Sequence, residues 1–442
     1  MTERPRGTGD ASFWEDADAH VLRYAPSFSP VVVERAAGSV LYLSDGREVI
    51  DFTSGQMSAI LGHSHPAITA TVRDAAENLV HLFSGMLSRP VVELSRRLAA
   101  SMPAPLEKVL LLSTGAESNE AALRLAKLVT GKHEVVALDR SWHGMTMAAA
   151  SATYSAPHLG YGPSVPGNIA LPTPDVFRPE VTDAHGRLDW SAQLDLGFAQ
   201  VDAQSSGSLA ACIVEPILSS AGVIVPPAGY FAALREKCDE RGMLLIFDEA
   251  QTGLCRTGDM YAFEHEGIVP DIVTLSKTLG AGLPLAAIVT SGEIERRAYE
   301  RDFLFFTTHV SDPLAAAVGN TVLDVLEHEG LRAQVGVKGE QLAAGLADLK
   351  SRHEVVGDVR GRGLMQGLEF VRDGANKAPA PELGAAVTSR CLALGLHVNV
   401  VQLGNLGGSL RIAPALTTPP EQIARGLEIL DQAISESVQD IG

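Results

Sequence analysis

A lysine and an aspartate, each at the end of a short apolar run, are the residues of this sequence best placed for chemistry. Lys277 follows the run Ile272–Leu275 and is itself followed by glycines and a proline at 280–284. A lysine in a dry pocket can lose its proton and attack a carbonyl carbon, because burial disfavours the ammonium form. A single lysine after a strand is usually a surface residue, so other segments must decide between the two interpretations.

Asp248 ends the apolar run 243–247, where a buried carboxylate would face a ligand cation. Taken alone, an aspartate at such a position often caps a turn or a helix. Lys277 and Asp248 are nevertheless the pair that pyridoxal 5'-phosphate needs. The lysine carries the aldehyde as a Schiff base, and the aspartate keeps the pyridine nitrogen protonated.

Two further strand ends carry residues that suit such a cofactor. The run 110–112 leads into Ser-Thr-Gly-Ala-Glu-Ser-Asn-Glu at 113–120 and then into apolar residues at helical spacing. Backbone N–H groups and the dipole at a helix start favour an anion, although an ordinary turn has the same pattern. Trp142 and His143 follow the run 135–138. An aromatic pair there can stack on a flat ring, although a core tryptophan is equally common.

The apolar runs alternate with helical segments, which predicts a mostly parallel sheet with helices on both faces. Because ligands of such sheets bind at the carboxyl ends of the strands, the residues named above are expected to meet there. Helices are predicted over 67–101 with a break at 81–86, and an irregular segment over 155–195. The predicted strands are 110–112, 135–138, 209–214, 243–247, 272–275 and 285–289.

The ends of the chain differ from this alternating part. Residues 31–52 contain strand-like runs broken by glycines, which predicts a meander, and from about 330 a smaller α/β pattern follows. We therefore predict three parts: 1–60 as an N-terminal arm and part of a small domain, 61–329 as a large cofactor-binding domain, and 330–442 as the C-terminal small domain.

Composition excludes several classes of protein. A formal net charge of −18 argues against a nucleic-acid partner, because no basic surface would attract phosphates. No apolar run approaches bilayer length, so no membrane partner is expected, and residues 1–20 do not resemble a secretory signal. The cysteines lack metal-ligand or redox spacing, which predicts reduced thiols and a cytoplasmic protein: Cys212, Cys238, Cys255 and Cys391.

Asp-Glu-Ala-Gln-Thr-Gly at 248–253, with Ser-Lys-Thr-Leu-Gly-Ala-Gly-Leu-Pro at 276–284, resembles the class III aminotransferases. Four more strings resemble the 2,2-dialkylglycine decarboxylases of that class: 51–59, 81–90, 215–220 and 307–313. The resemblance implies an α/β fold of the fold type I pyridoxal-phosphate transferases. That fold has a large domain around a mostly parallel seven-stranded sheet and a smaller α/β domain. It also implies a homo-oligomer, a dimer of dimers whose active site is shared across the dimer.

The resemblance also implies roles for single residues. Lys277 would carry the cofactor, Asp248 would pair with its pyridine nitrogen, and Trp142 would lie against its ring. Gln251 would face the phenolic oxygen. The phosphate would be held by Thr114, Gly115 and Ala116, together with Thr308 from the partner subunit. Lys277, Gln56 and Trp142 make up the implied catalytic set.

For the substrate, the resemblance implies that Arg411 grips a carboxylate and that Gln56 holds the carboxylate to be lost. Ser220 stands near the position where many ω-aminotransferases have a glutamate that masks the arginine. The implied reaction converts a 2,2-dialkylglycine such as 2-aminoisobutyrate to carbon dioxide and a ketone. Pyruvate then accepts the amino group and becomes L-alanine. The alternative is an ordinary class III aminotransferase that acts on an ω-amino acid or an amine without decarboxylation. A non-catalytic cofactor-binding protein is disfavoured by the presence of both Lys277 and Asp248.

Alkali-metal ions are the last implication of the resemblance. A potassium ion, or alternatively sodium, would be bound by Leu82, Ser84, Thr308, Val310 and Asp312. A second, structural sodium site would map to Ala99, Met102, Pro103 and Leu106. At this second site Met102 replaces a threonine whose hydroxyl is a ligand, which leaves three carbonyls for the ion.

Overall fold

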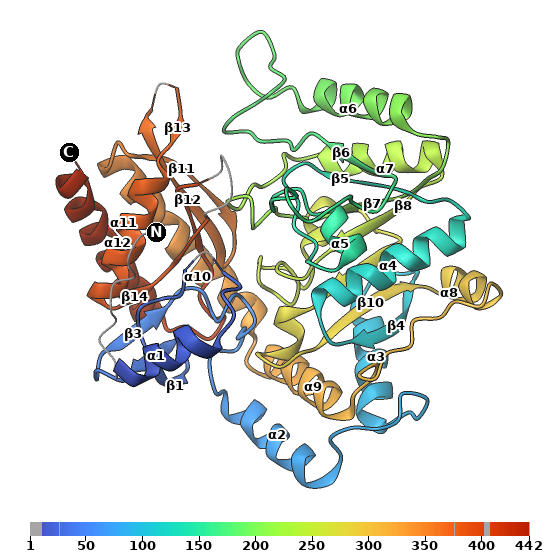
Figure 1. The fold of residues 1–442 in the computed structure, drawn as a ribbon, viewed down its shortest axis with the longest axis horizontal. Coiled ribbons are helices and arrows are strands. Elements are labelled where there is room, and N and C mark those ends of the chain that lie inside the picture. The colour runs from blue at the N-terminus through green and yellow to red at the C-terminus, as the bar shows by residue number, and fades with distance from the viewer. Residues whose placement is uncertain (1–10, 26, 375, 402–406, 442) are drawn as a thin grey trace.

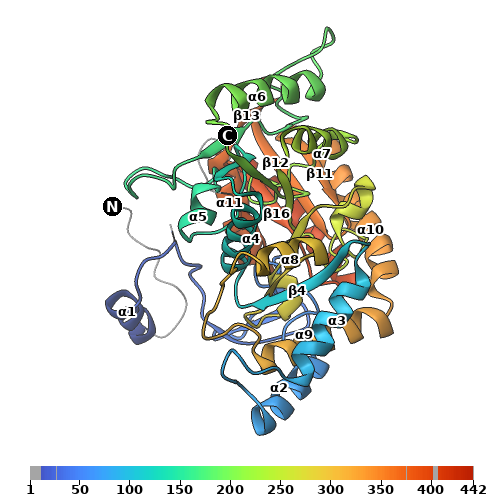
Figure 2. The same ribbon diagram turned by 90° about the vertical axis from the view of Figure 1, so that its right-hand side faces the viewer.

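The chain forms two lobes in the computed structural model, which describes residues 11–25, 27–374, 376–401 and 407–441. In Figure 1 the middle of the chain builds one lobe, and the C-terminal part joins the N-terminal strands in the other. The predicted N-terminal arm begins in residues 1–10, which lie outside the described residues. Helix α1 (Ala11–His20) has no buried residues and stands away from the body of the molecule (Figure 2).

A seven-stranded sheet organises the larger lobe. Its order is β4-β10-β9-β8-β7-β5-β6, and every pairing is parallel except those of β10, which runs antiparallel to β4 and β9. The mostly parallel sheet is therefore confirmed. The strands are β4 (Leu106–Leu112), β5 (Glu134–Leu138), β6 (Asn168–Leu171), β7 (Leu209–Val214), β8 (Leu244–Asp248), β9 (Ile272–Leu275) and β10 (Ala286–Ser291).

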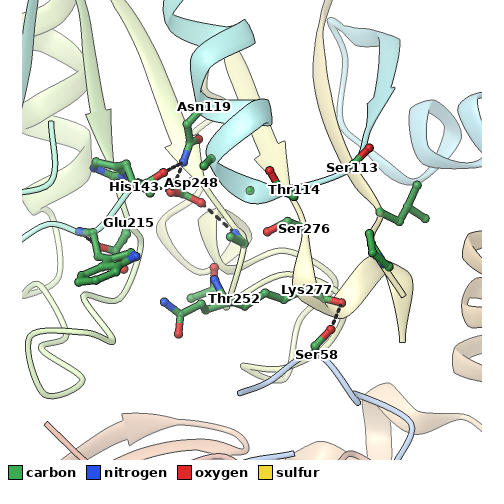
Figure 3. A pocket seen from close by; sticks show the side chains of 18 of the residues that line it. Ser58, Ser113, Thr114, Asn119, His143, Glu215, Asp248, Thr252, Ser276 and Lys277 are labelled. Atoms are coloured by element: carbon green, nitrogen blue, oxygen red, sulfur yellow. Dashed lines mark hydrogen bonds and ion pairs between the residues drawn. The ribbon is translucent and has the colours of Figure 1, made fainter. Parts of the chain in front are cut away.

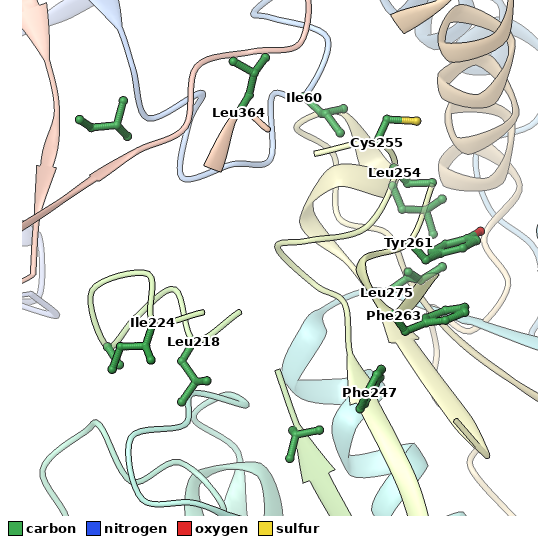
Figure 4. Packing of buried hydrophobic residues seen from close by; sticks show 14 of the residues in the cluster. Ile60, Leu218, Ile224, Phe247, Leu254, Cys255, Tyr261, Phe263, Leu275 and Leu364 are labelled. Atoms are coloured by element: carbon green, nitrogen blue, oxygen red, sulfur yellow. The ribbon is translucent and has the colours of Figure 1, made fainter. Parts of the chain in front are cut away.

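Both faces of this sheet are buried, which explains why its strands are almost continuously apolar. Along β8, Leu245 and Phe247 belong to the larger core cluster, whereas Ile246 between them belongs to a second cluster on the opposite face. Figure 4 shows Phe247 and Leu275 packing in the larger cluster with Tyr261 and Phe263. The surrounding helices are α2 (Pro66–Asn78), α3 (Arg89–Ser101), α4 (Gly115–Thr130), α5 (Met147–Ser151), α6 (Trp190–Gln204), α7 (Tyr230–Arg241), α8 (Gly292–Tyr299) and α9 (Pro313–His328).

The prediction of an irregular segment over 155–195 is wrong for part of it. β6 lies inside this segment and forms the edge of the sheet, parallel to β5. β6 has four residues, two of which are buried, and Gly167 and Pro172 flank it. So short a run between turn residues carries too little periodicity to be distinguished from a loop.

The smaller lobe contains two sheets. The predicted meander is confirmed as β1 (Val33–Ala37), β2 (Val40–Leu43) and β3 (Glu48–Asp51), and β3 pairs in parallel with β14 (Leu396–His397). Both ends of the chain therefore contribute to this lobe. The domain limits at residues 60 and 330 stay a prediction. The other sheet has the order β11 (Val356–Arg362), β12 (Met365–Asp373), β16 (Ser409–Ile412) and β15 (Asn399–Val400), with β13 (Ala378–Pro379) beside β12. Its helices are α10 (Leu331–Arg352), α11 (Pro381–Leu394) and α12 (Pro420–Ile441).

Among the described residues, no helix is both long enough and apolar enough to cross a membrane. The four cysteines are buried and free, as the sequence predicted. The cytoplasmic location stays a prediction.

Candidate active site

A cavity of about 350 Å³ lies at the carboxyl ends of the sheet strands, where the sequence places its reactive residues (Figure 3). The start of α4, the segment after β5, the end of β8 and the residues after β9 all contribute to its wall. The predicted cofactor-binding residues meet here with the exception of Thr308: Thr114, Gly115, Ala116, Trp142, Asp248, Gln251 and Lys277.

Lys277 opens the short 3₁₀ helix η2 (Lys277–Gly280) with a φ of 36°, a left-handed conformation that is uncommon outside glycine. Its carbonyl oxygen accepts a hydrogen bond of 3.1 Å from the Ser58 hydroxyl. Burial lowers the pKa of the Lys277 ammonium, although the nearby carboxylates of Asp248 and Glu215 oppose this shift. The strained backbone and the lowered pKa are both typical of a lysine that acts as a nucleophile.

Asp248 is held by three hydrogen-bonding groups at the end of β8, where its side chain is only 3% exposed. Asn119 Nδ2 donates to its Oδ2 at 2.8 Å, His143 Nδ1 lies 2.9 Å from the same oxygen, and the Ala250 N–H donates to Oδ1 at 3.1 Å. Burial raises the pKa of Asp248, but His143, the positive charge of Lys277 and the hydrogen bond from Asn119 together outweigh burial, so the pKa is lower than in water. The carboxylate is therefore charged and suited to a protonated ring nitrogen.

The start of α4 has the features of a phosphate site. Thr114 precedes the helix, and its hydroxyl accepts a hydrogen bond from the Glu117 N–H at 3.2 Å. A Cβ atom on Gly115 would lie 2.6 Å from the Ser276 hydroxyl oxygen, so the close approach of these two segments requires glycine. The Ser276 hydroxyl is buried in this cavity and has no hydrogen-bond partner among the residues that the structure describes. A bound anion would supply the missing acceptor.

Trp142 is tied to the cavity by its backbone, since its N–H donates to Glu215 Oε1 at 2.8 Å. Burial raises the pKa of Glu215 to about 7, while the nearby His143 opposes the rise and Asp248 adds to it. At neutral pH this carboxyl group is therefore divided between its charged and neutral forms.

A second cavity of about 510 Å³ shares Trp142, Gln251 and Lys277 with the first. Its wall also contains the three predicted substrate residues, Gln56, Ser220 and Arg411. The cofactor-binding and substrate-binding residues predicted from the sequence thus face one connected space, and their individual roles stay predictions.

Gln56 lies in an unusual backbone segment. Four consecutive residues have a positive φ: Ser54 with 42°, Gly55 with 56°, Gln56 with 60° and Met57 with 69°. Asp51 supports the segment, because its carboxylate accepts hydrogen bonds from the Thr53 N–H at 2.8 Å and the Gly55 N–H at 3.0 Å. A conformation that costs free energy at a non-glycine residue indicates that the position of Gln56 matters for function.

Arg411, on β16, donates from Nε and Nη2 to the side-chain oxygen of Asn399 at 3.2 and 2.9 Å. Burial lowers the pKa of Arg411, and Glu215 opposes this shift. Within the described ranges, Arg411 has no carboxylate as a salt-bridge partner, as expected from the absence of an acid at Ser220. The guanidinium is thus available to a substrate carboxylate.

Thr308 is exposed in the segment before α9 and does not line either cavity of its own chain. The contact of Thr308 with the phosphate of the cofactor bound in a partner subunit stays a prediction. Ser84 donates to the carbonyl oxygens of Thr307 at 2.8 Å and Thr308 at 3.2 Å, so the two loops of the predicted potassium site lie together.

The carboxylate of Asp312, another predicted potassium ligand, contacts two histidines. Its oxygens lie 2.5 Å from His81 Nδ1 and 2.6 Å from His309 Nδ1. Leu82 and Val310 belong to the same two loops. At the predicted sodium site, the carbonyls of Ala99 and Pro103 accept hydrogen bonds from the N–H groups of Met102 and Leu106. Both ion sites stay predictions.

Sequence reasoning missed several supporting contacts at the site. It placed His143 there as one of an aromatic pair and Asn119 in the turn before the helix, but it did not predict that both hold Asp248. Arg256, three residues after the Asp-Glu-Ala-Gln-Thr-Gly string, is fully buried, and burial lowers its pKa to about 9. It donates to the carbonyl oxygens of Leu364, at 3.3 Å, and Pro414, and to the Ser54 hydroxyl at 3.2 Å. No local pattern in the sequence predicts contacts between residues so far apart.

The residues present fit pyridoxal 5'-phosphate. A lysine with a lowered pKa, a charged buried aspartate and a helix start with an unpartnered hydroxyl line one cavity. These match the aldehyde, the ring nitrogen and the phosphate of the cofactor, which when bound supplies an electron-accepting ring.

Comparison with known proteins gives the family. The model of the class III aminotransferases matches residues 23–434. The chain is 50% identical to an uncharacterized aminotransferase of Schizosaccharomyces pombe, over 97% of this chain and 96% of that protein. It is 34% identical to the 5-aminovalerate aminotransferase of Pseudomonas aeruginosa, over 95% of this chain and 96% of that protein.

Solved structures agree with this assignment. An (S)-enantioselective ω-transaminase from Thermomicrobium roseum has a TM-score of 0.87 at 29% identity, over 98% of this chain and 99% of that one. A transaminase from the marine bacterium Virgibacillus has a TM-score of 0.89 at 26% identity, over 98% and 100% of the two chains. The fold is that of the fold type I pyridoxal-phosphate transferases, and the chain belongs to the class III aminotransferase family.

Proposed function

We propose that this protein transfers an amino group from a carboxylate-bearing donor to a 2-oxo acid, without decarboxylation. The observation that carries the proposal is Arg411, a partly buried guanidinium that has no carboxylate partner among the described residues and lines the cavity that also contains Lys277. The relatives named for an ω-amino acid or for acetylornithine support ordinary transamination of this kind. The decarboxylating reaction implied by the sequence resemblance becomes the second candidate.

Each residue would contribute a separate step. Arg411 would bind and orient the substrate carboxylate through paired N–H donors. Lys277, with its lowered pKa, would accept the proton that leaves the substrate carbon and return it later. Asp248 would keep its negative charge opposite the ring nitrogen, and Trp142 would cover the ring and help to exclude water.

The second candidate is decarboxylation of a 2,2-dialkylglycine such as 2-aminoisobutyrate, followed by transfer of the amino group to pyruvate. The left-handed backbone of Gln56 favours it, because this strained residue directs an amide into the cavity lined by Lys277 and Arg411. An amide can donate to a second carboxylate while Arg411 contacts the rest of the substrate.

One experiment separates the two candidates. The cofactor-loaded protein is incubated with pyruvate and either 5-aminovalerate or 2-aminoisobutyrate, and L-alanine, carbon dioxide and acetone are measured. Alanine from 5-aminovalerate without carbon dioxide supports the main proposal. Equal amounts of alanine, carbon dioxide and acetone from 2-aminoisobutyrate establish the second candidate instead. A third outcome would refute the role of Arg411 in binding the substrate carboxylate. In this outcome neither donor yields alanine, and the variant Arg411→Ala exchanges amino groups between alanine and pyruvate as fast as wild type.

We also propose a homo-oligomer whose active site is completed by Thr308 of a partner subunit. The exposed position of Thr308, outside the cavities of its own chain, supports this proposal. Mixing the inactive variants Lys277→Ala and Thr308→Ala tests it. If the sites are shared, some of the mixed dimers contain one intact site and recover activity, whereas unshared sites give none.

A further inference from the structure

One carboxylate-binding edge of the Arg411 guanidinium, the edge formed by Nε and Nη2, is occupied by the side chain of Asn399. The two residues are direct partners in the antiparallel pairing of β15 and β16. From this position Asn399 Oδ1 accepts hydrogen bonds from both Nε, at 3.2 Å, and Nη2, at 2.9 Å. The amide oxygen therefore takes the place on the guanidinium fork that one oxygen of a substrate carboxylate would take.

A neutral amide differs from a carboxylate in this position. Asn399 satisfies two donors of a partly buried guanidinium, and leaving these donors unpaired would cost free energy. It does so without cancelling the positive charge of Arg411. A carboxylate binds a guanidinium more strongly than an amide does, because both partners are charged. An entering carboxylate can thus replace Asn399, whereas an uncharged group cannot.

We propose that Asn399 is a specificity-determining residue that caps Arg411 reversibly. A substrate carboxylate displaces the cap, and the cap stays in place when the substrate group beside Arg411 is uncharged. The inference rests on the proposed function, since it assigns Arg411 to substrate binding. The cap on Arg411 would let one cavity accept two kinds of amino donor. One kind places a carboxylate beside Arg411, and the other places an apolar group there.

The rest of the cavity is consistent with this role. Its wall contains Gln56, Ser220, Asn399 and Arg411, and none of its described lining residues is acidic. The charge of Glu215 acts on Arg411 from the adjoining cofactor cavity, but no described residue in the wall of this cavity offers a carboxylate to the guanidinium. The flanking residues Val398 and Val400 offer no side-chain acceptor that could replace the amide.

Two substitutions at this position test the proposal in opposite directions. Asn399→Asp keeps the shape but gives Arg411 a charged partner, whereas Asn399→Ala removes the cap. In cofactor-loaded protein, the Kd for isobutyrate is measured by calorimetry, and the KM for isopropylamine is measured with pyruvate at saturation. Gln204→Glu, an exposed change in α6 with the same charge difference, serves as the control.

For isobutyrate, Asn399→Asp should raise the Kd on the order of 100-fold, because an ion pair must be broken before the probe binds. Asn399→Ala should lower it by about fivefold, because no competitor remains. For isopropylamine, Asn399→Asp should leave the KM within about twofold of wild type and Asn399→Ala should raise it about fivefold. The control should match wild type in both measurements.

Shifts of the isobutyrate Kd in the same direction for both variants, or shifts below about twofold, would overturn the role of Asn399. If the Kd values give this result while wild-type protein still forms alanine, only the role of Asn399 is wrong and the proposed function stands. Failure of the proposed function shows differently, as wild-type protein that yields no alanine from any donor. Calorimetry with isobutyrate reports on Arg411 in either case, because it does not depend on turnover.

Discussion

The replacement of Glu215 by glutamine should make the protein more stable at alkaline pH. Glu215 is buried beside Asp248, and its pKa is raised from 4.5 to about 7. Between these two pH values the folded protein holds a proton that the unfolded chain has released. The free energy of unfolding therefore falls as the pH rises through this window. Below about pH 4.5 both states are protonated and the penalty is absent.

The size of the effect follows from the shift. A difference of one pKa unit corresponds to about 1.4 kcal/mol, so the raised pKa of Glu215 lowers the stability by about 3 kcal/mol above pH 7. Glutamine has a similar shape and no charge, and its side-chain oxygen can accept the hydrogen bond from the Trp142 N–H. The variant should gain most of this free energy at pH 8 and little at pH 5.

Urea unfolding of the cofactor-free protein, at pH 5 and pH 8 and at one protein concentration, measures the difference directly. Glu249, whose pKa is also raised to about 7 by burial, contributes equally to wild type and variant and so cancels in the comparison. If wild type and Glu215→Gln lose the same stability between pH 5 and pH 8, Glu215 is already charged throughout this range. The proposed effect of burial on Glu215 would then be refuted.

Three further outcomes follow from the site. Lys277→Ala should abolish turnover and remove the absorbance band of covalently bound cofactor from the spectrum of the dialysed protein. A retained band would show that the cofactor is attached to a residue other than Lys277. Gly115→Ala should weaken cofactor binding about tenfold in a fluorescence titration, because its Cβ would meet the Ser276 hydroxyl; unchanged affinity would contradict this close approach. Asp51→Asn should destabilise the protein at pH 7 by about 2 kcal/mol in urea unfolding. Burial raises the pKa of Asp51, but its hydrogen bonds outweigh burial and lower the pKa, so the difference should shrink as the pH falls below 3.8.

The position of the cofactor cavity could be predicted from the sequence because parallel strands end at one edge of their sheet. Lys277, Asp248 and Gly115 are each identified by the apolar run before them, and this order along the chain is enough to bring them together. The antiparallel direction of β10 was missed, although the short connection from β9 leaves no room for a parallel crossover. The existence of β6 could not be predicted, since the pairing of so short an edge strand depends on a partner that is not its neighbour in the chain.

The support around the site was harder to predict than the site itself. Asn119 reaches Asp248 from the buried side of α4, and Asn399 meets Arg411 because of the register between two short strands. Periodicity shows which residues are buried but gives no information on such pairs. The resemblance to decarboxylases singled out Gln56, and the structure adds that its backbone is left-handed. Which reaction this residue serves depends on the substrate experiment above.

Arg256 has a consequence for the order in which the protein matures during synthesis. Its partners Ser54, Leu364 and Pro414 lie 202, 108 and 158 residues away along the chain, on both sides of it. A ribosome releases the strands of the cofactor sheet well before it releases Pro414. The nascent chain can thus assemble the cofactor cavity while the wall that selects the substrate is still missing. Within one chain, substrate selection is then acquired after the cofactor cavity.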